Sequence, residues 1–598
     1  MSRVFTVSTE LAWMLRTLGR GREPRPGVRT PGLHATLLEL RGWVDDPRPY
    51  DKRHHKKPWK TVAADASEVL DTVGEGLRAL APSLDALASL VHDTELGASP
   101  TWRDRCRAAL VAAADELTSP SAAVAALDDL HAAILDPATA YDVAERRTLH
   151  LNGVLRFGGR TLNTEGEGLA GILLDEATSV DTAHAIIAGD PDPAIRRPNE
   201  RADLTEPERF ALCRELLQHR LPRGTQVVWL CFENAHCRFP NWILPIGGVT
   251  FINGPTLVPV LDDIATGTLP PHLRGSLPGE LLDDVASLRW HLDVAKHNEG
   301  LKEWVWARVD LGDEPYVSPL AQARRIATSL VDLAAFHDNG THWRLMDGAL
   351  LLVDGRVRLG GLFNRSVAAS EFARHFTSET LGELADELAP HVPSIAEPLL
   401  ELLAAARTVQ GNTAEHSNTA LLIDVQVIEL IATMTGTPLW HKHLRSDLAG
   451  TWARTVLLDE LIDAYLPPTG EFELHELPEV EAIGGLYEHV TDDRIDRLRL
   501  RYDLALHRLP AICAALPVHA PGARRLRTLN DRLSSTTSAG QWIDDLVRQY
   551  GAAVDRLARC RNSIAHAGPT NREVVESVRR FGNDQAGRVT SIAIWATV

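Results

Sequence analysis

QWIDDLVRQYGAAVDRLARCRNSIAH, residues 541–566, is the stretch of sequence that decides the C-terminal fold. Apolar residues recur in it at steps of three and four, the spacing of one face of an α-helix. This stripe consists of Ile543, Leu546, Val547, Tyr550, Val554, Leu557 and Ile564. The pattern predicts one long amphipathic helix. Arg561 falls on the same stripe, where a charge is costly unless a partner or a cleft receives it.

Ala567-Gly568-Pro569 predicts the end of this helix, because glycine can adopt the left-handed C-terminal conformation and proline cannot continue the helix. The next helix is predicted to begin at Thr570, with Glu573 three residues later in a capping-box pattern. His566 then lies in the last helical turn, where free carbonyls and the helix dipole favour a cation. Histidine and arginine at such a helix end suit attack of a 2′-hydroxyl on its own phosphate.

The spacing of these residues is not specific by itself. With 55 arginines and 24 histidines in 598 residues, chance predicts about 2.2 cases of R-x4-H, and three occur. Requiring asparagine directly after the arginine lowers the expectation to about 0.06, and only RNSIAH at 561–566 satisfies it. The motif also lies in the one basic region of an acidic chain.

That region, residues 494–598, holds 17 arginines, no lysines and nine acidic residues, a net charge of +8 in a chain of net charge −18. Arginine binds phosphate well through its planar set of donors, although arginine outnumbers lysine throughout this chain. Residues 494–516 are predicted to form a further helix whose basic side carries Arg494, Arg497, Arg501 and Arg508. These arginines, except Arg508, are candidate RNA contacts.

The remaining sequence predicts a mostly helical α+β multidomain protein. We expect a helical N-terminal region (1–150), a mixed α+β domain (151–365), a helical connector region (366–448) and a C-terminal all-α domain (449–598). Strands are predicted at 226–232, 248–252, 304–311 and 349–353, with helices at 277–296 and 318–337. Asp354-Gly355 predicts a tight hairpin, because both residues tolerate the positive φ of a type I′ turn.

Composition limits the class of protein. Of the residues, 44% are hydrophobic and 24% charged, which is typical of a globular protein. No run of sequence is apolar enough for a membrane span, and Glu10 interrupts the only stretch that resembles a signal peptide. Six scattered cysteines argue against a disulfide framework. We expect a cytoplasmic protein with no membrane partner.

Three weaker motifs leave alternatives open. The basic segment RPYDKRHHKKPWK (48–60) is either a solvated loop or an RNA contact in which Tyr50 or Trp59 stacks on a base. The segment GEGLAG (166–171) matches a dinucleotide-binding fingerprint, but turn glycines are the better interpretation. Cys231, His236 and Cys237 form C-x4-H-C, which lacks the second ligand pair of a structural zinc site and favours buried thiols.

RCRNSIAHAGPTNREVVESV (559–578) resembles the HEPN superfamily of helical domains, and in particular the C-terminal ribonuclease domains of large ApeA-type defence proteins. The resemblance covers about the last 100 to 150 residues, and no family is recognised in residues 1–440. It implies a metal-independent, cofactor-free endoribonuclease that acts as a homodimer and leaves 2′,3′-cyclic phosphate ends. Arg561 would hold the scissile phosphate, Asn562 would orient the site, and His566 would activate the 2′-hydroxyl or protonate the leaving oxygen. Arg556 and Arg559 are additional candidate RNA contacts without support from the family.

The resemblance also implies a role in antiviral defence, in which a toxin-like effector cleaves tRNA or other cellular RNA and arrests growth after an unknown activator appears. The alternative is a non-catalytic HEPN-fold module that binds RNA or protein as a dimer. The first 440 residues would act as sensor, regulator or substrate-positioning part. Their acidic charge suggests the further hypothesis that they hold an arginine-rich cleft closed.

Overall fold

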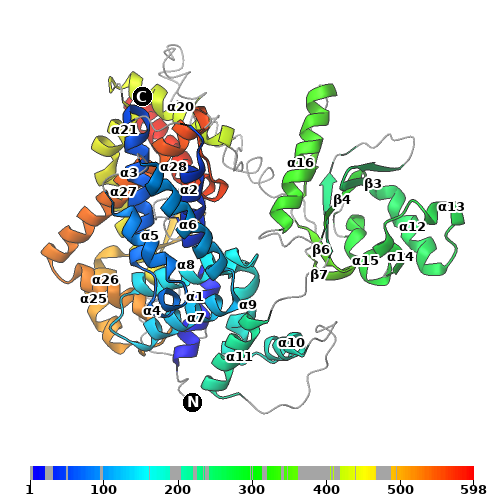
Figure 1. Cartoon of the computed structure of the whole chain (residues 1–598), viewed down its shortest axis with the longest axis horizontal. Helices are drawn as coiled ribbons and strands as arrows, with labels where there is room; N and C mark the ends of the chain where they lie inside the picture. Colours follow the sequence, from blue (N-terminus) through cyan, green and yellow to red (C-terminus); the bar gives the residue numbers. More distant parts are fainter. Residues whose placement is uncertain are drawn as a thin grey trace. The chain divides into compact units, whose positions relative to one another are not determined.

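The computed structural model describes most of the chain. The described residues are 5–19, 31–48, 52–93, 99–160, 162–188, 204–219, 225–233, 235, 242–283, 285–296, 298, 301–312, 319–338, 343–346, 348–360, 405, 409, 418–437, 439–465, 487–492, 495–566 and 568–597. Two compact units emerge: Met1–Arg220 together with Ile395–Val598, and Leu221–Ser394. The first unit is helical, and the second contains a sheet (Figure 1).

The N-terminal part of the helical unit runs continuously through the predicted boundary at residue 150. Its helices are α1 (Val7–Gly19), α2 (Leu33–Asp45), α3 (Lys52–Asp71), α4 (Glu75–Leu80), α5 (Ser83–Val91), α6 (Pro100–Leu117), α7 (Pro120–Leu135), α8 (Tyr141–Phe157), α9 (Leu162–Leu173), α10 (Ala177–Ile187) and α11 (Glu206–Gln218). Residue 150 lies inside α8, and the first strand begins at Gln226. The predicted mixed domain therefore starts later than expected.

The C-terminal part of the same unit supplies the remaining helices. They are α20 (Asn418–Met434), α21 (Trp440–His443), the π-helical segment Leu444–Leu448, α22 (Ala449–Tyr465), α25 (Tyr502–Ala515), α26 (Ala523–Leu533), α27 (Thr536–Ala565) and α28 (Arg572–Thr597). The long helix predicted from residue 541 is α27, which begins earlier, where the Ser535 side chain accepts a hydrogen bond from the Ser538 amide. Most of the predicted connector (366–448), including 366–404 and 410–417, lies outside the described residues.

The N- and C-terminal helices of this unit share one hydrophobic core. Leu40 of α2, Trp59 of α3 and Leu546 of α27 belong to the same buried cluster. Burial of such apolar surface is the main stabilising contribution to folding. Helix α27 contacts α3 as well as α20, α22 and α28. Residues 449–598 are therefore not packed as a separate domain, in contrast to the predicted division.

The second unit is built on an antiparallel sheet with the strand order β2-β3-β4-β1-β6-β7, and β5 also pairs with β1. The strands are β1 (Gln226–Glu233), β2 (Ile243–Ile246), β3 (Val249–Asn253), β4 (Trp304–Gly312), β5 (Arg344–Leu345), β6 (Leu350–Val353) and β7 (Arg356–Gly360). The helices are α12 (Gly254–Thr266), α13 (Pro271–Arg274), α14 (Gly279–Asp283), α15 (Val285–Leu292) and α16 (Pro319–Asp338), with a 3₁₀ turn at Val294–Lys296. All four predicted strands and both predicted helical segments are confirmed.

The alternation of side chains along β1 explains why helices cover both faces of this sheet. Trp229 and Cys231 face one apolar cluster with α12 and α15, whereas Leu230 and Phe232 face another with α16 (Figure 1). Successive side chains of a strand point to opposite faces, so a continuous apolar run requires cover on both sides. The β6–β7 hairpin is also confirmed: Asp354 has φ 51° and Gly355 has φ 74°, as a type I′ turn requires.

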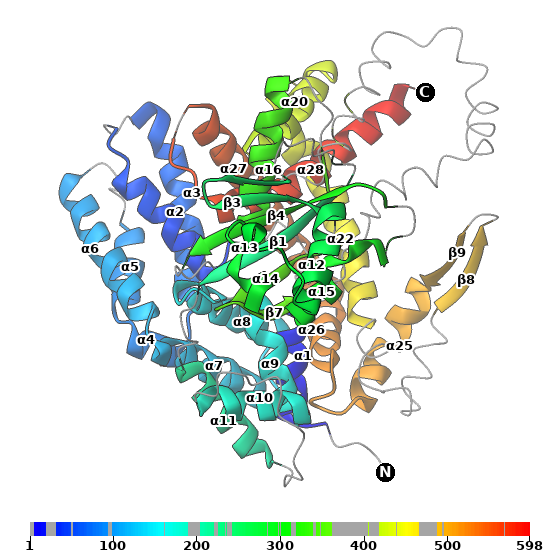
Figure 2. The same ribbon diagram turned by 90° about the vertical axis from the view of Figure 1, so that its right-hand side faces the viewer.

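One predicted helix is confirmed only in part, because α25 (Tyr502–Ala515) begins later than residue 494. Residues 495–500 form strand β9 (Ile495–Leu500), which pairs antiparallel with β8 (Tyr487–Asp492) ahead of α25 (Figure 2). The alternating sequence Arg497-Leu498-Arg499-Leu500 carries the two-residue period of a strand, which outweighs the helical spacing over this short segment. The mostly helical α+β class is confirmed. Within the described ranges, no helix is long and apolar enough to cross a membrane.

Candidate functional site at the end of helix α27

Helix α27 ends at the predicted motif, but the geometry of its end differs from the expectation. His566 caps the helix with φ −116° and ψ 21°, and its amide donates to the Asn562 carbonyl at 3.0 Å. Gly568 does not adopt the left-handed conformation. Glycine is needed there for space, because a Cβ would lie 2.9 Å from Ser563 Cα. The Gly568 amide donates to the Ser563 carbonyl, so the turn folds back over the last helical residues.

Arg561 has the partner that its place on the apolar stripe requires. Its guanidinium donates to Glu429 of α20 at 3.0 Å and to the Asn562 side-chain oxygen at 3.2 Å. The side chain is 30% exposed. The guanidinium is thus held at the surface by two acceptors, and Glu429 would compete with any phosphate for it.

Asn562 and His566 are both exposed. Asp555, Arg559 and Asn562 follow at steps of four and three on one face of α27, and His566 follows one turn later. Arg561 is 100° from Asn562 around the axis of a regular helix, on the side that faces α20. The structure therefore brings Asn562 to the Arg561 guanidinium, but by helical geometry Arg561 and His566 lie on different sides of the helix end.

The turn after α27 is held by the N-terminal helices. The Arg48 side chain donates to the His566 carbonyl at 3.2 Å, and Pro569 lies against Gly42 of α2. Burial would raise the pKa of Asp46, but hydrogen bonds from Arg48 lower it below its usual value, so Asp46 stays ionised and holds Arg48 in place. The backbone at His566 is thereby fixed while its imidazole remains exposed.

The cap of α28 also differs from the prediction. The Asn571 side chain, not Thr570, accepts the hydrogen bond from the Val574 amide. Glu573 instead lies 3.0 Å from His34 Nδ1 and 2.9 Å from Arg156. Burial raises the pKa of Glu573, but the hydrogen bond with His34 and the charge of Arg156 hold it below its usual value. Glu573 therefore ties the start of α28 to α2 and α8.

Two predicted RNA contacts are wrong, because Arg556 and Arg559 are only 1% and 3% exposed. Arg556 donates to both oxygens of Asp65, at 2.8 and 3.1 Å. Arg559 donates to both oxygens of Glu39, each at 2.9 Å, and to Asp65 at 2.8 Å. Guanidinium groups with all these acceptors inside the core bind the N-terminal helices, not a nucleic acid.

The same arrangement explains much of the uneven charge along the chain. Arg524 is buried against Glu10, Arg525 against Glu460, and Arg579 against Asp424. Two of these three acids come from C-terminal helices and one from α1. These arginines form internal ion pairs, so they are not available to line an arginine-rich cleft.

Of the remaining predicted RNA contacts, the structure describes the side chain of Arg501 alone. Arg494 lies outside the described residues, and Arg497 is on strand β9, whose side chains there are also outside them. Arg501 is exposed at the start of α25 and pairs with Asp503 at 3.2 Å. Among the described residues, Arg501 forms no hydrogen bond or ion pair with the motif at 561–566.

The glycine-rich segment does not form the turn that was expected. Gly166 and Gly171 lie within α9, where a Cβ would meet Leu15 of α1 at 3.2 Å or the Ser179 side chain, so they are neither turn glycines nor a phosphate loop. Cys231 is buried in β1, whereas His236 and Cys237 lie outside the described residues. Within the described ranges, no group of three or more potential metal ligands comes together.

Trp59 is 2% exposed and packs between Trp43 and Trp102, with ring centroids 5.7 and 5.5 Å away, so it is not available to stack on a base. The segment around it is helix α3, not a loop. Tyr50 lies outside the described residues. The lysines of this helix remain exposed: Lys56, Lys57 and Lys60.

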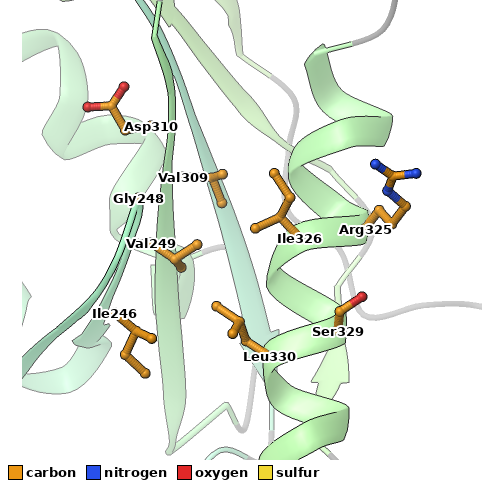
Figure 3. A pocket seen from close by; sticks show the side chains of 9 residues that line it. All are labelled: Ile246, Gly248, Val249, Val309, Asp310, Arg325, Ile326, Ser329 and Leu330. Carbon is orange, nitrogen blue, oxygen red and sulfur yellow. The ribbon is translucent and has the colours of Figure 1, made fainter.

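A groove in the sheet unit was not predicted from the sequence. Its volume is about 560 Å³, and it lies between α16 and strands β2, β3 and β4 (Figure 3). Apolar side chains face it, including Val249, Val309, Ile326 and Leu330, whereas the charged ends of Asp310 and Arg325 point away. Asp310, Arg325 and Ser329 are the polar residues of its lining.

Comparison with known proteins finds no relative: no family model, no curated protein and no solved structure matches the chain.

Proposed function

We propose that this protein is a metal-independent endoribonuclease of the HEPN type that acts through Arg561, Asn562 and His566. The observation that carries the proposal is that an exposed imidazole and a partly exposed guanidinium occur at one helix end, within the motif that resembles this superfamily. The C-terminal helices around α27 would form the HEPN-like bundle. RNA is the substrate, and tRNA is one candidate.

The chemistry requires two proton transfers. The 2′-oxygen attacks the adjacent phosphorus as its proton leaves, and the bond from phosphorus to the 5′-oxygen breaks as that oxygen takes up a proton. His566 accepts the first proton or supplies the second. Arg561 offsets the charge that develops on the phosphoryl oxygens, and Asn562 orients its guanidinium. The products are a 2′,3′-cyclic phosphate and a 5′-hydroxyl.

A homodimer would supply a group for each of the two proton transfers. One chain offers one His566, and its Arg561 points towards α20, so a second copy facing the same RNA supplies the other proton-transfer group. Cleavage of cellular RNA by such a dimer would arrest growth during infection by a virus once an activator is present. We propose this defence role together with the nuclease activity.

The alternative is a non-catalytic module that binds RNA or protein. The Arg561–Glu429 ion pair favours it, because a guanidinium committed to a carboxylate has a structural role. The two functions make different predictions for His566, whose imidazole is exposed and is not needed for that pair.

The test is incubation of the full chain with total RNA in the presence of EDTA, next to His566→Ala. The proposal predicts that only the wild type produces fragments with cyclic phosphate ends. His507→Ala, which removes an exposed histidine of α25, should cleave like the wild type. The assay is repeated with RNA and extract from infected cells, to supply an activator. Equal behaviour of the wild type and His566→Ala under both conditions would support the binding module.

A further inference from the structure

The first half of α3 has a sequence that opposes its own helix dipole. Lysine, arginine or histidine fills each of its first six positions, Lys52 to Lys57, and no acidic residue lies in the first turn. The N-terminus of a helix carries partial positive charge, so cations there are unfavourable and anions are stabilising. A segment that breaks a local rule of this kind is where a functional reason is expected.

The lysines of this segment are presented to solvent by a firmly anchored helix. Lys56 and Lys60 are one turn apart and exposed, and neither forms an ion pair with any residue that the structure describes. Lys57 is 65% exposed. On the opposite side of α3, Trp59, Val62 and Ala66 are buried in the core. An apolar face committed to the core cannot insert into a lipid surface, which argues for a dissolved polyanion.

This basic half of α3 runs beside the last turns of α27. Thr61 of α3 accepts a hydrogen bond from Arg559, and Asp65, one turn later, binds Arg556. Arg48, four residues before α3, contacts the His566 carbonyl. Lys57 of the basic half pairs with Asp555, which lies two turns before Asn562 on the same face of α27.

A third element adds positive charge next to Lys57. Arg445, in the π-helical segment, and Lys57 both pair with Asp555 of α27, and Arg445 also donates to the Gly551 carbonyl. His441 of α21 lies close by, and burial together with the charges of Lys57 and Arg445 lowers its pKa. Asp555 is the carboxylate at the centre of this group. π-Helical turns occur frequently at functional sites.

We propose that Lys56, Lys57 and Lys60, with Arg445, form a binding track for the phosphate backbone of an RNA strand, which leads the strand to Asn562 and His566. This inference rests on the proposed function for its choice of RNA. It assigns to the N-terminal part of the chain the role of holding the substrate. Backbone contacts of this kind supply affinity and register without sequence preference.

The test compares the full chain with a variant in which all three lysines are replaced, Lys56→Gln, Lys57→Gln and Lys60→Gln. The probe is a labelled 2′-O-methyl RNA, which binds but cannot be cleaved through a 2′-hydroxyl. We expect weaker binding, and the slope of log Kobs against log salt concentration should decrease in magnitude by about 2 to 3, the value for three lost phosphate contacts. The helix should not be lost, because removing cations from its N-terminus is favourable.

The matched control removes the same net charge elsewhere, by changing the exposed Arg454, Arg508 and Arg548 to Gln. It should bind like the wild type. The proposal is overturned if the control loses as much affinity as the lysine variant, if the wild type does not bind the probe, or if polyglutamate competes as well as RNA does. The last result would indicate an acidic protein partner.

Cleavage assays separate this inference from the proposed function. The lysine variant should raise KM and leave kcat unchanged, whereas His566→Ala should lose kcat and bind the probe normally. If the lysine variant binds weakly but the wild type cleaves no RNA, the binding track is supported and the proposed nuclease activity is contradicted. If the wild type cleaves RNA and the lysine variant has an unchanged KM, the nuclease activity is supported and the binding track is contradicted.

Discussion

Arg556, Arg559 and Arg561 lie within two turns of one helix and have different roles. The first two are buried and bind Asp65 and Glu39 from helices about 500 positions earlier in the chain, with separations of 491 and 520 residues. Arg561 is at the surface beside Asn562. Helical periodicity predicted which face of the helix is buried. It does not reveal which acidic residue, far away in the sequence, pairs with a given arginine. The end of the helix was therefore located correctly, whereas Arg556 and Arg559 were assigned the wrong role.

Asp65 provides the first prediction at this scale. Asp65→Asn leaves Arg556 and Arg559 buried with too little negative charge, and it should lower the free energy of unfolding by about 3 to 5 kcal/mol. The measurement is chemical denaturation. Asp71→Asn, at an exposed position on the same helix, is the control and should change stability by about 0.5 kcal/mol or less. Equal effects of the two variants would show that the ion pairs are not structural.

His150 provides a pH-dependent prediction. Burial, with the charges of Arg147 and Arg146, lowers the pKa of His150 to about 3. The unfolded chain binds a proton near pH 6.5, where the folded chain does not, so stability should fall as pH decreases from about 6.5 towards 3.

His150→Gln should reduce the slope of the unfolding free energy against pH by up to about 1.4 kcal/mol per pH unit across that window. Above pH 7, where His150 is neutral in both states, the slope should not change. The measurement is the free energy of unfolding at several pH values. His507→Gln, at an exposed position, is the matched control. Parallel profiles for the wild type and His150→Gln would contradict the role of burial.

At the scale of elements, local patterns predicted what depends on neighbouring residues. The β6–β7 hairpin was predictable because Asp354 and Gly355 alone determine the turn. Strand β9 was not predicted, because its apolar residues fit a helical spacing as well as the alternation of a strand. The charge of the segment 48–60 was evident from the sequence. Its helical form depends on the burial of Trp59, which the sequence does not show.

The end of α27 gives the prediction for an element. Gly568→Ala places a Cβ against Ser563 and should destabilise the protein by about 1 to 3 kcal/mol through overpacking. Gly551→Ala, in the same helix with nothing within 4 Å of the new Cβ, should stabilise it by up to about 1 kcal/mol. Thermal unfolding of both variants checks the pair. A loss of stability in Gly551→Ala, or none in Gly568→Ala, would contradict the described helix end.

At the scale of the whole molecule, the two ends of the chain form one helical unit. The sequence predicted separate domains at 1–150 and 449–598, because composition and periodicity carry no information about contacts between distant segments. The shared core and the buried pairs of Arg524, Arg556 and Arg559 with N-terminal acids join them. This union also brings α3 against α27, the helix that carries the predicted motif.

A fragment of residues 450–598 should therefore not fold alone. It would expose the apolar surface that α2 and α3 cover and leave Arg556 and Arg559 without Asp65 and Glu39. We expect broad thermal unfolding in circular dichroism, whereas the full chain should show a cooperative transition for this unit. A sharp transition in the isolated fragment would show that the C-terminal helices form an independent domain.

The measurement that tests the central claim most directly is cleavage of an RNA with one altered sugar. The site at which the wild type cuts a given RNA is mapped, and the same RNA is made with a 2′-deoxy sugar there. We predict that cleavage at that site disappears with the deoxy sugar, and that His566→Ala slows cleavage of the unaltered RNA by about 10²- to 10⁴-fold without loss of binding. Cleavage that needs neither the 2′-hydroxyl nor His566, or no cleavage of any RNA, would contradict the account.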